Sequence, residues 1–303
     1  MLAIFSIPKP FRGHIGVIQR NAITSWSLLH PRPEVILFGD EAGTAEIAQE
    51  LGLRHVPDVR RNEHGTPVVN DIFAKAQSLA GHDILCYVNA DIVLLGDFMK
   101  AVQQVAAQCG QFLMAGQRTD VDLQVPIDFR SSDWELRMRT LASTEGVPRE
   151  LHAFDYFVFH RGLYLDIPPF ALGRLYWDVW LFWKACSLKV RVVDASPVVL
   201  AIHQIHDYAH YPNGLAGMAE GEEALANQKL AGVGGTYTLE DATHSLTARG
   251  IRWNFGHLFV PVKRRFVRWF RAGLVWTAPI RHPLGLRRRS IAGLMARIGL
   301  TKT

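Results

Sequence analysis

Cysteine is scarce in this sequence, and so are apolar runs long enough to cross a membrane. The three cysteines among 303 residues lie inside apolar segments without the spacing of a metal site. We expect them to be small core residues in a reducing compartment, so a disulfide framework is excluded and a cytoplasmic protein is predicted. No segment approaches about 18 uncharged apolar residues, so no membrane-spanning helix is expected, and the N-terminus lacks the basic region of a signal peptide.

Glycine-rich phosphate-binding motifs are also missing. Neither G-x-G-x-x-G nor G-x-x-x-x-G-K-[ST] occurs in the loops after the predicted strands. This absence argues against a dinucleotide enzyme and against a P-loop NTPase. Any phosphate group must therefore be held by a metal ion or by cationic side chains.

Acidic residues are absent from residues 251–303, which contain 12 of the 33 Lys and Arg. Residues 1–250 hold the other 21 basic residues against 28 acidic ones, so the net charge of +5 belongs to the tail. Its aromatic and apolar residues are interleaved with Arg and Lys, which is typical of a basic amphipathic helix at an anionic membrane surface. A partner protein is the next alternative. Nucleic acid comes last, because no zinc-finger spacing or RNP-like motif is present.

Strands and helices are predicted to alternate through the first part of the chain. Strand-like runs occupy residues 2–7, 34–38, 53–59 and 84–88, with helical periodicity between them. This order predicts an α/β fold with parallel strands. A content of 49% apolar residues is enough to form the core of one large domain with an appendage. We expect a domain over residues 1–235 and a basic, helical extension over residues 236–303.

The central stretch is residues 82–98, HDILCYVNADIVLLGDF. It places Asn89-Ala90-Asp91 directly after a buried strand, and open α/β sheets bind ligands at the carboxyl ends of their strands. Asp91 is therefore a candidate oxygen ligand for Mg²⁺ or Mn²⁺, which protein carboxylates and substrate phosphates hold together. Simple turn chemistry is the alternative.

Residues 1–212 resemble the GT-A nucleotide-sugar glycosyltransferases of the family 2 type, whose DxD signature follows this strand. Asn89 departs from the first position of that signature. The resemblance implies a Rossmann-like, mostly parallel sheet flanked by helices, a nucleotide-diphosphate sugar donor, and a divalent metal (Mn²⁺ or Mg²⁺) on Asp91 and His203. The residues it assigns to the donor are Ser6, Ile7, Pro8, Asp40, Arg61, Asn70 and Asn89. For Asp40, a helix cap or turn role is the alternative.

Two further aspartates are candidates for chemistry. Asp155 lies in the strand-like run AFDYFVFH, where a charge is costly unless it is paired, so it indicates a partner or a site. Asp178 lies between Trp177 and Trp180, whose rings could stack an acceptor sugar and whose apolar surroundings would raise the pKa of the carboxyl toward that of a general base. The alternative is that Asp178 caps a core helix.

Three histidines lie close together after the last strand of this region, at His203, His206 and His210. On a helix this H-x-x-H-x-x-x-H spacing would favour a zinc hydrolase. Because His203 directly ends a strand, the GT-A-like arrangement is preferred, with His206 on the acceptor side and His210 structural.

The sequence therefore predicts metal-dependent, inverting transfer of a sugar to a hydroxyl of a glycan or lipid-linked acceptor, with Asp178 as base and Asp155 positioning hydroxyls. A retaining mechanism stays open. The alternatives are a sugar nucleotidyltransferase, a zinc-type hydrolase and a non-catalytic carbohydrate-binding protein. Residues 212–235 are a candidate lid or a linker, and residues 239–250 are expected to form a small helix.

Overall fold

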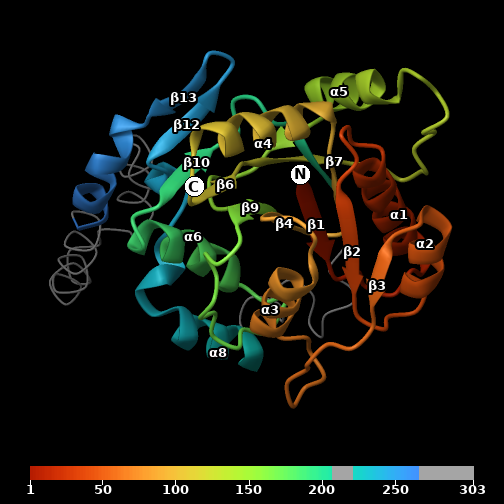
Figure 1. Ribbon diagram of the computed structural model, residues 1–303, viewed down its shortest axis with the longest axis horizontal. Helices are drawn as coiled ribbons and strands as arrows, with labels where there is room; N and C mark the ends of the chain where they lie inside the picture. Colours follow the sequence, from red (N-terminus) through yellow and green to blue (C-terminus); the bar gives the residue numbers. More distant parts are fainter. Residues whose placement is uncertain (207–220, 266–303) are drawn as a thin grey trace, which may run out of the picture. The chain divides into compact units, whose positions relative to one another are not determined.

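A nine-stranded sheet organises the first part of the computed structural model, which describes residues 1–206 and 221–265 (Figure 1). Its strand order is β13-β12-β10-β6-β9-β4-β1-β2-β3. The pairs among β1 to β4 are parallel, and β9 runs antiparallel to both neighbours, β4 and β6. The strands are β1 (Leu2–Ser6), β2 (Glu34–Phe38), β3 (Arg54–Val56), β4 (Ile84–Val88), β6 (Phe112–Ala115), β9 (Tyr156–His160), β10 (Arg191–Asp194), β12 (His244–Thr247) and β13 (Gly250–Trp253). The predicted α/β class with a mostly parallel central sheet is confirmed.

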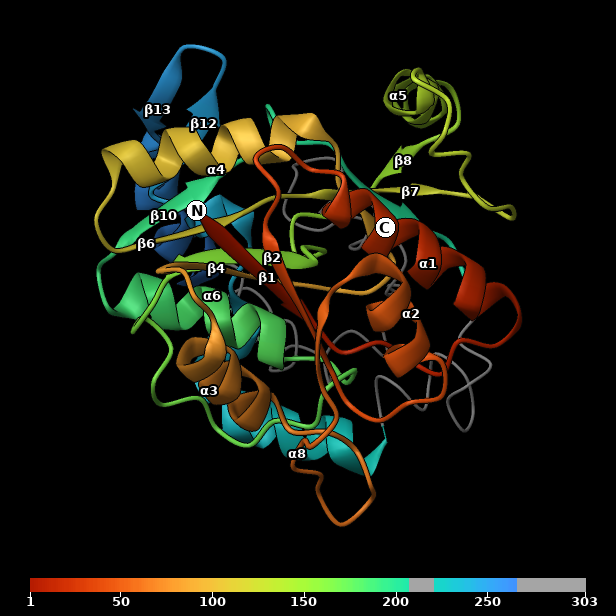
Figure 2. The ribbon, with the colours of Figure 1, turned by 45° about the vertical axis from the view of Figure 1, so that its right-hand side comes forward.

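Helices cover both faces of this sheet (Figure 2). Along β1, Ile4 packs with the helices of one face and Phe5 with those of the other, because successive side chains of a strand project to opposite faces. One face carries α1 (Gly13–Ser27), α2 (Thr44–Leu51) and α4 (Gly96–Gln108). The other carries α3 (Val69–Leu79), α6 (Trp177–Ser187) and α8 (Glu222–Ala231). Cys86 and Cys109 are buried and Cys186 is half-buried; all three are free thiols.

A second sheet of four strands has the order β5-β11-β7-β8. Its members are β5 (Ile92–Val93), β7 (Arg118–Val121), β8 (Val147–Pro148) and β11 (Ala201–Gln204). Apolar side chains of β5, β7 and β11 pack on α5 (Trp134–Thr144). The chain leaves the main sheet at the end of β4 and enters the second sheet at β5. The short turn over residues 89–91 is therefore fixed at both ends by a strand.

The end of the first unit differs from expectation. Residues 239–250 form a short 3₁₀ helix, η2 (Leu239–Asp241), and part of the β12–β13 hairpin instead of one helix, since β12 pairs with the edge offered by β10. Another 3₁₀ helix, η1 (Gly232–Thr236), precedes it. This first compact unit extends from Met1 to Asn254.

A second unit covers Phe255–Thr303, and the structure describes it as far as residue 265. Residues 255–265 are helical and begin with the 3₁₀ helix η3 (Phe255–Phe259). The rest of the predicted basic tail, the first part of the candidate lid and His210 lie outside the described residues. In the part of the chain that is described, no helix combines the length and the apolar character needed to cross a membrane.

Candidate functional site

Strand pairing in the second sheet brings Asp91 and His203 together. Asp91 immediately precedes β5, and β5 runs antiparallel to β11 with Ile92 opposite His203. The backbone N–H of Gln204 donates to the carbonyl oxygen of Asp91 at 3.2 Å. Two residues further along, His206 also reaches the turn that contains Asp91.

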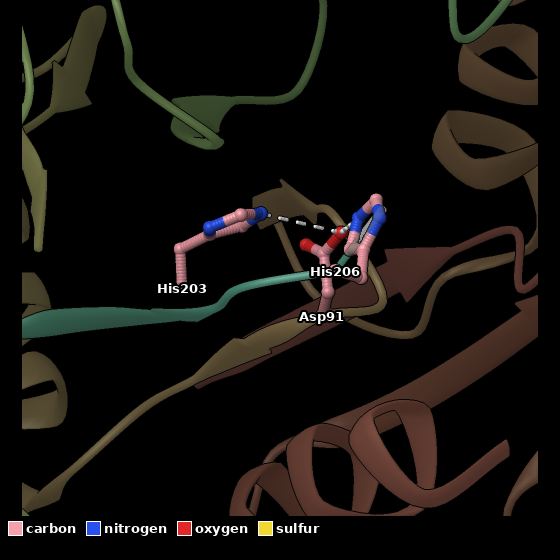
Figure 3. A group of neighbouring side chains, drawn as sticks. All are labelled: Asp91, His203 and His206. Atoms are coloured by element: carbon pink, nitrogen blue, oxygen red, sulfur yellow. Dashed lines mark hydrogen bonds and ion pairs between the residues drawn. The ribbon is translucent and has the colours of Figure 1, made fainter. Parts of the chain in front are cut away.

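The side chains of Asp91, His203 and His206 form a cluster (Figure 3). Oδ2 of Asp91 lies 3.2 Å from Nε2 of His206 and 3.8 Å from Nε2 of His203. One candidate ligand atom from each residue lies within 4.8 Å of the other two. Burial raises the pKa of the Asp91 carboxyl, but its interactions with His203, His206 and Lys9, including a hydrogen bond with His206, outweigh burial and hold the pKa well below its usual range.

This donor set fits a divalent cation. Carboxylate oxygen and imidazole nitrogen are both ligands of Mn²⁺ and Zn²⁺, whereas Mg²⁺ prefers oxygen donors alone. Oδ1 of Asp91 is buried and has no hydrogen-bond partner among the described residues. Because an unpaired buried carboxylate oxygen is costly, its presence favours an ion that would satisfy it.

Asn89 belongs to a buried polar network beneath the cluster. Its Nδ2 donates to Oδ1 of Asp155 at 2.8 Å, and Nη1 of Arg118 lies 2.5 Å from Oδ2 of the same carboxylate. An aspartate at position 89 would place a second negative charge against Asp155, so the amide explains the departure from DxD. Both oxygens of Asp155 are engaged within the protein, and the charge of its carboxylate is paired, as its buried position requires.

A cavity of about 360 Å³ opens beside Asp91. It lies at the carboxyl ends of β1 and β4 and is closed by the loops around residues 61–67 and 172–174. Five residues predicted to contact a nucleotide or metal line it: Ile7, Pro8, Arg61, Asn89 and Asp91. His206, which was predicted to contact the acceptor, lines it as well.

The remaining predicted nucleotide contacts lie near this cavity but do not line it. Ser6 is buried and its hydroxyl donates to the carbonyl of Val88, which ties β1 to β4. Asp40 is exposed and accepts a hydrogen bond from Arg61 at 2.7 Å, which holds the pKa of its carboxyl below the usual range. Asn70 accepts from Arg60.

Trp177 and Trp180 are placed in the hydrophobic core, with each residue 5% exposed. The ring of Trp177 packs edge-on against Tyr87 at 5.2 Å between centroids, and Trp180 packs on Phe170 at 5.5 Å. The expectation that both rings stack an acceptor sugar therefore needs correction, because both residues are almost fully buried among core aromatics. Neither is among the described residues that line the cavity.

Asp178 lies in the first turn of α6, and its Oδ1 accepts a hydrogen bond from the N–H of Val179 at 2.8 Å. Burial raises the pKa of its carboxyl to about 7, and the nearby charge of Asp155 acts in the same direction. Tyr87 lines the cavity and contacts Trp177, so the first turn of α6 lies behind the cavity wall. A carboxyl with this pKa changes its protonation near neutral pH, but Asp178 is not among the described residues that line the cavity.

Two cavity residues, Lys9 and Arg174, were not among the predicted site residues. Burial lowers the pKa of Lys9, and the charges of Asp91 and Arg174 also act on it. Arg174 is 2.5 Å from Glu223 of α8, whose other oxygen accepts from Asn62 at 2.7 Å. The position of Lys9 after the first strand was the available signal, because that loop belongs to the same sheet edge as Asp91.

Comparison with known proteins supports the fold. S. aureus TarS (residues 1–349) in complex with UDP-GlcNAc is 14% identical, with a TM-score of 0.51 over 77% of this chain and 66% of that one. The chain thus spans slightly less than two thirds of residues 1–349 of TarS, and 39% of the longer TarS chain. Glucosyl-3-phosphoglycerate synthase from Mycobacterium tuberculosis, with Mn²⁺, UDP and phosphoglyceric acid, is 14% identical over 77% of this chain and 78% of that one, with a TM-score of 0.44. No protein-family model and no curated protein sequence matches. The likeness to TarS agrees with the GT-A-like fold predicted from the sequence.

Proposed function

We propose that this protein is a metal-dependent glycosyltransferase that moves a sugar from a nucleotide-diphosphate donor to a hydroxyl acceptor. The observation that carries the proposal is the cluster of Asp91, His203 and His206 at the rim of a cavity at the strand ends. The cavity is also lined by Lys9, Arg61 and Arg174, and clefts with such cations attract anionic ligands. The binding of UDP-GlcNAc by TarS, which shares the fold, supports a nucleotide-sugar donor.

In this proposal Asp91, His203 and His206 hold the metal, which supplies Lewis-acid stabilisation of the diphosphate leaving group. Lys9 and Arg174 add positive charge where the diphosphate lies. Ile7, Pro8 and Arg61 contact the nucleoside side of the donor. Asn89 and Asp155 are proposed to support the turn that carries Asp91, since their side chains are hydrogen-bonded to each other.

Asp178 is proposed as the general base that takes the proton of the acceptor hydroxyl for in-line attack and inversion. Its raised pKa, about 7, matches that task, because a base works best when its pKa is near the working pH. The acceptor is proposed to be a glycan or a lipid-linked glycan.

Binding of UDP should depend on the metal. We expect UDP with Mn²⁺ to raise the thermal midpoint of unfolding by roughly 5 °C or more at saturating concentration, because a ligand that binds only the native state stabilises it. UDP alone and Mn²⁺ alone should have smaller effects. The measurement is a thermal-shift series over nucleoside diphosphates with and without Mn²⁺, followed by detection of UDP released from UDP-sugars.

Other outcomes of the same series would favour the alternatives. Preference for a nucleoside triphosphate, with release of pyrophosphate, would identify a nucleotidyltransferase. Tightly held zinc whose content does not change in an Asp91→Ala variant would favour a hydrolase based on His203, His206 and His210. Glycan binding without any nucleotide effect would indicate a carbohydrate-binding protein.

The second unit is proposed to bind an anionic membrane surface on the cytoplasmic side. Phe255, Leu258, Phe259 and Val262 are exposed, and Lys263, Arg264 and Arg265 follow them in the sequence. Each basic residue near such a surface contributes about 1 kcal/mol. Replacing all three by alanine should therefore weaken binding to phosphatidylserine-containing vesicles by up to roughly 100-fold. Co-sedimentation measures this, and equal binding to vesicles of pure phosphatidylcholine would contradict an electrostatic attachment.

A further inference from the structure

Asp120 is a buried carboxylate that the proposed reaction does not use. It lies on β7 and is 9% exposed. β7 runs parallel to β11 in a register that pairs Asp120 with His203. Because paired residues of neighbouring strands project toward the same face of a sheet, the two side chains meet.

The imidazole of His203 lies between two carboxylates. Nδ1 of His203 is 3.0 Å from Oδ1 of Asp120, and Nε2 is 3.8 Å from Oδ2 of Asp91. Both atoms of the 3.0 Å contact are buried, and neither forms a well-aligned hydrogen bond with a described residue, so Oδ1 of Asp120 is the nearest available partner of Nδ1. Asp120 thus lies at the Nδ1 edge of the imidazole ring, and Nε2 on the other side of the ring points toward Asp91.

We propose that Asp120 is a positioning residue that holds His203 with its proton on Nδ1 and its Nε2 lone pair toward the metal. This inference rests on the metal site of the proposed function. A neutral imidazole carries one N–H, so a carboxylate beside Nδ1 leaves Nε2 as the acceptor atom available to a cation. Such a partner also fixes the orientation of the ring and makes the ligand nitrogen more basic.

A purely structural role for Asp120 is the rival explanation. Its Oδ1 lies 3.0 Å from Nε of Arg118, and its Oδ2 lies 3.4 Å from Nε of Arg149. The carboxylate could serve only to balance these arginines. Arg118 also pairs with Asp155, so replacing it would disturb Asn89 as well. Arg149, whose side chain is 42% exposed, offers a cleaner control.

The affinity of the full-length protein for Mn²⁺, measured by isothermal titration calorimetry, separates the two roles. We expect Asp120→Asn and Asp120→Ala to weaken binding by about 10–100-fold, as loss of a partner of a metal ligand usually does. The alanine variant should be the weaker of the two, because the asparagine carbonyl can still accept from Nδ1. Arg149→Ala and the exposed Asp122→Asn should leave the affinity within about 2-fold, since neither touches His203.

The tautomer of His203 gives a second readout that a structural role would not move. In protein labelled with ¹⁵N-histidine, with His203→Gln used for assignment, the wild-type ring should carry its proton on Nδ1, and Asp120→Ala should shift it toward Nε2. Thermal unfolding shows whether each variant is folded. If the Asp120→Ala variant is unfolded, the Mn²⁺ affinity of Asp120→Asn alone tests the proposal. Unchanged Mn²⁺ affinity in both folded variants would overturn this proposal alone. Failure of the wild type to bind Mn²⁺ would overturn both this proposal and the metal-dependent function.

Discussion

The Asp91→Ala variant is expected to lose Mn²⁺-dependent UDP binding. Asp91 contributes the only carboxylate of the described three-residue cluster, and both histidine Nε2 atoms lie within 3.8 Å of its Oδ2. Loss of a direct ligand should cost at least about 100-fold in Mn²⁺ affinity, because even residues that only support a ligand contribute 10–100-fold. Calorimetric titration of Mn²⁺, and of UDP in the presence of Mn²⁺, measures both effects.

Two further variants make this result specific. Asp91→Asn keeps the size of the side chain and removes its charge, so it should lose metal affinity while the packing around residues 89–92 is retained. Asp122→Ala removes an exposed carboxylate and should bind as the wild type does. UDP and Mn²⁺ affinities in Asp91→Ala equal to those of the wild type would remove Asp91 from the metal site.

Asp91 could be predicted because its signal is local. A buried strand followed by a polar turn places the turn at the carboxyl edge of a parallel sheet. The resemblance to GT-A glycosyltransferases assigned Ile7 and Pro8, which follow β1, to the donor, and both line the cavity. Parallel pairing of β1 with β4 puts both strand ends at one edge. The order of strands and helices along the chain predicted that the strands are parallel, but not which of them are neighbours.

His206 and Asp120 needed information that no local pattern contains. His206 was assigned to the acceptor, but the structure places it against Asp91. The arrangement depends on β5, which has only two residues, pairing with β11, and on β11 pairing with β7 in one particular register. A shift by one residue would turn Asp120 to the opposite face of the sheet, so its role depends on long-range register.

The aromatic residues show a different limit of prediction from sequence. A tryptophan on a helix can either fill the core or stack a sugar, and both uses favour the same residue type. Trp177 packs among Tyr87 and Phe157, where burial of its large ring stabilises the fold. This packing holds the first turn of α6, which carries Asp178, the proposed base.

Replacing Asp178 by asparagine is expected to lower kcat by about 10²–10⁴-fold, the usual contribution of a general base. The asparagine oxygen can still accept the N–H of Val179, so the start of α6 should be retained. In the wild type, kcat should rise with pH through about 7 as Asp178 loses its proton. The exposed Asp166→Asn serves as the matched control. Undiminished kcat in folded Asp178→Asn would assign the base elsewhere.

The same variant should be more stable than the wild type above pH 7. Burial raises the pKa of Asp178 to about 7, so the folded state keeps a proton that the unfolded chain loses at about pH 4. The folded state therefore binds more protons across that window, and the free energy of unfolding of the wild type falls as pH rises from about 4 to 7. Asparagine does not titrate, so its advantage should be small at pH 4 and reach at most about 4 kcal/mol by pH 8. Urea unfolding at both pH values measures the difference. A gain in stability that is the same at both pH values would show that Asp178 is not held protonated in the folded state. A residue that destabilises the fold when charged is expected where function, and not stability, determines which residue is present.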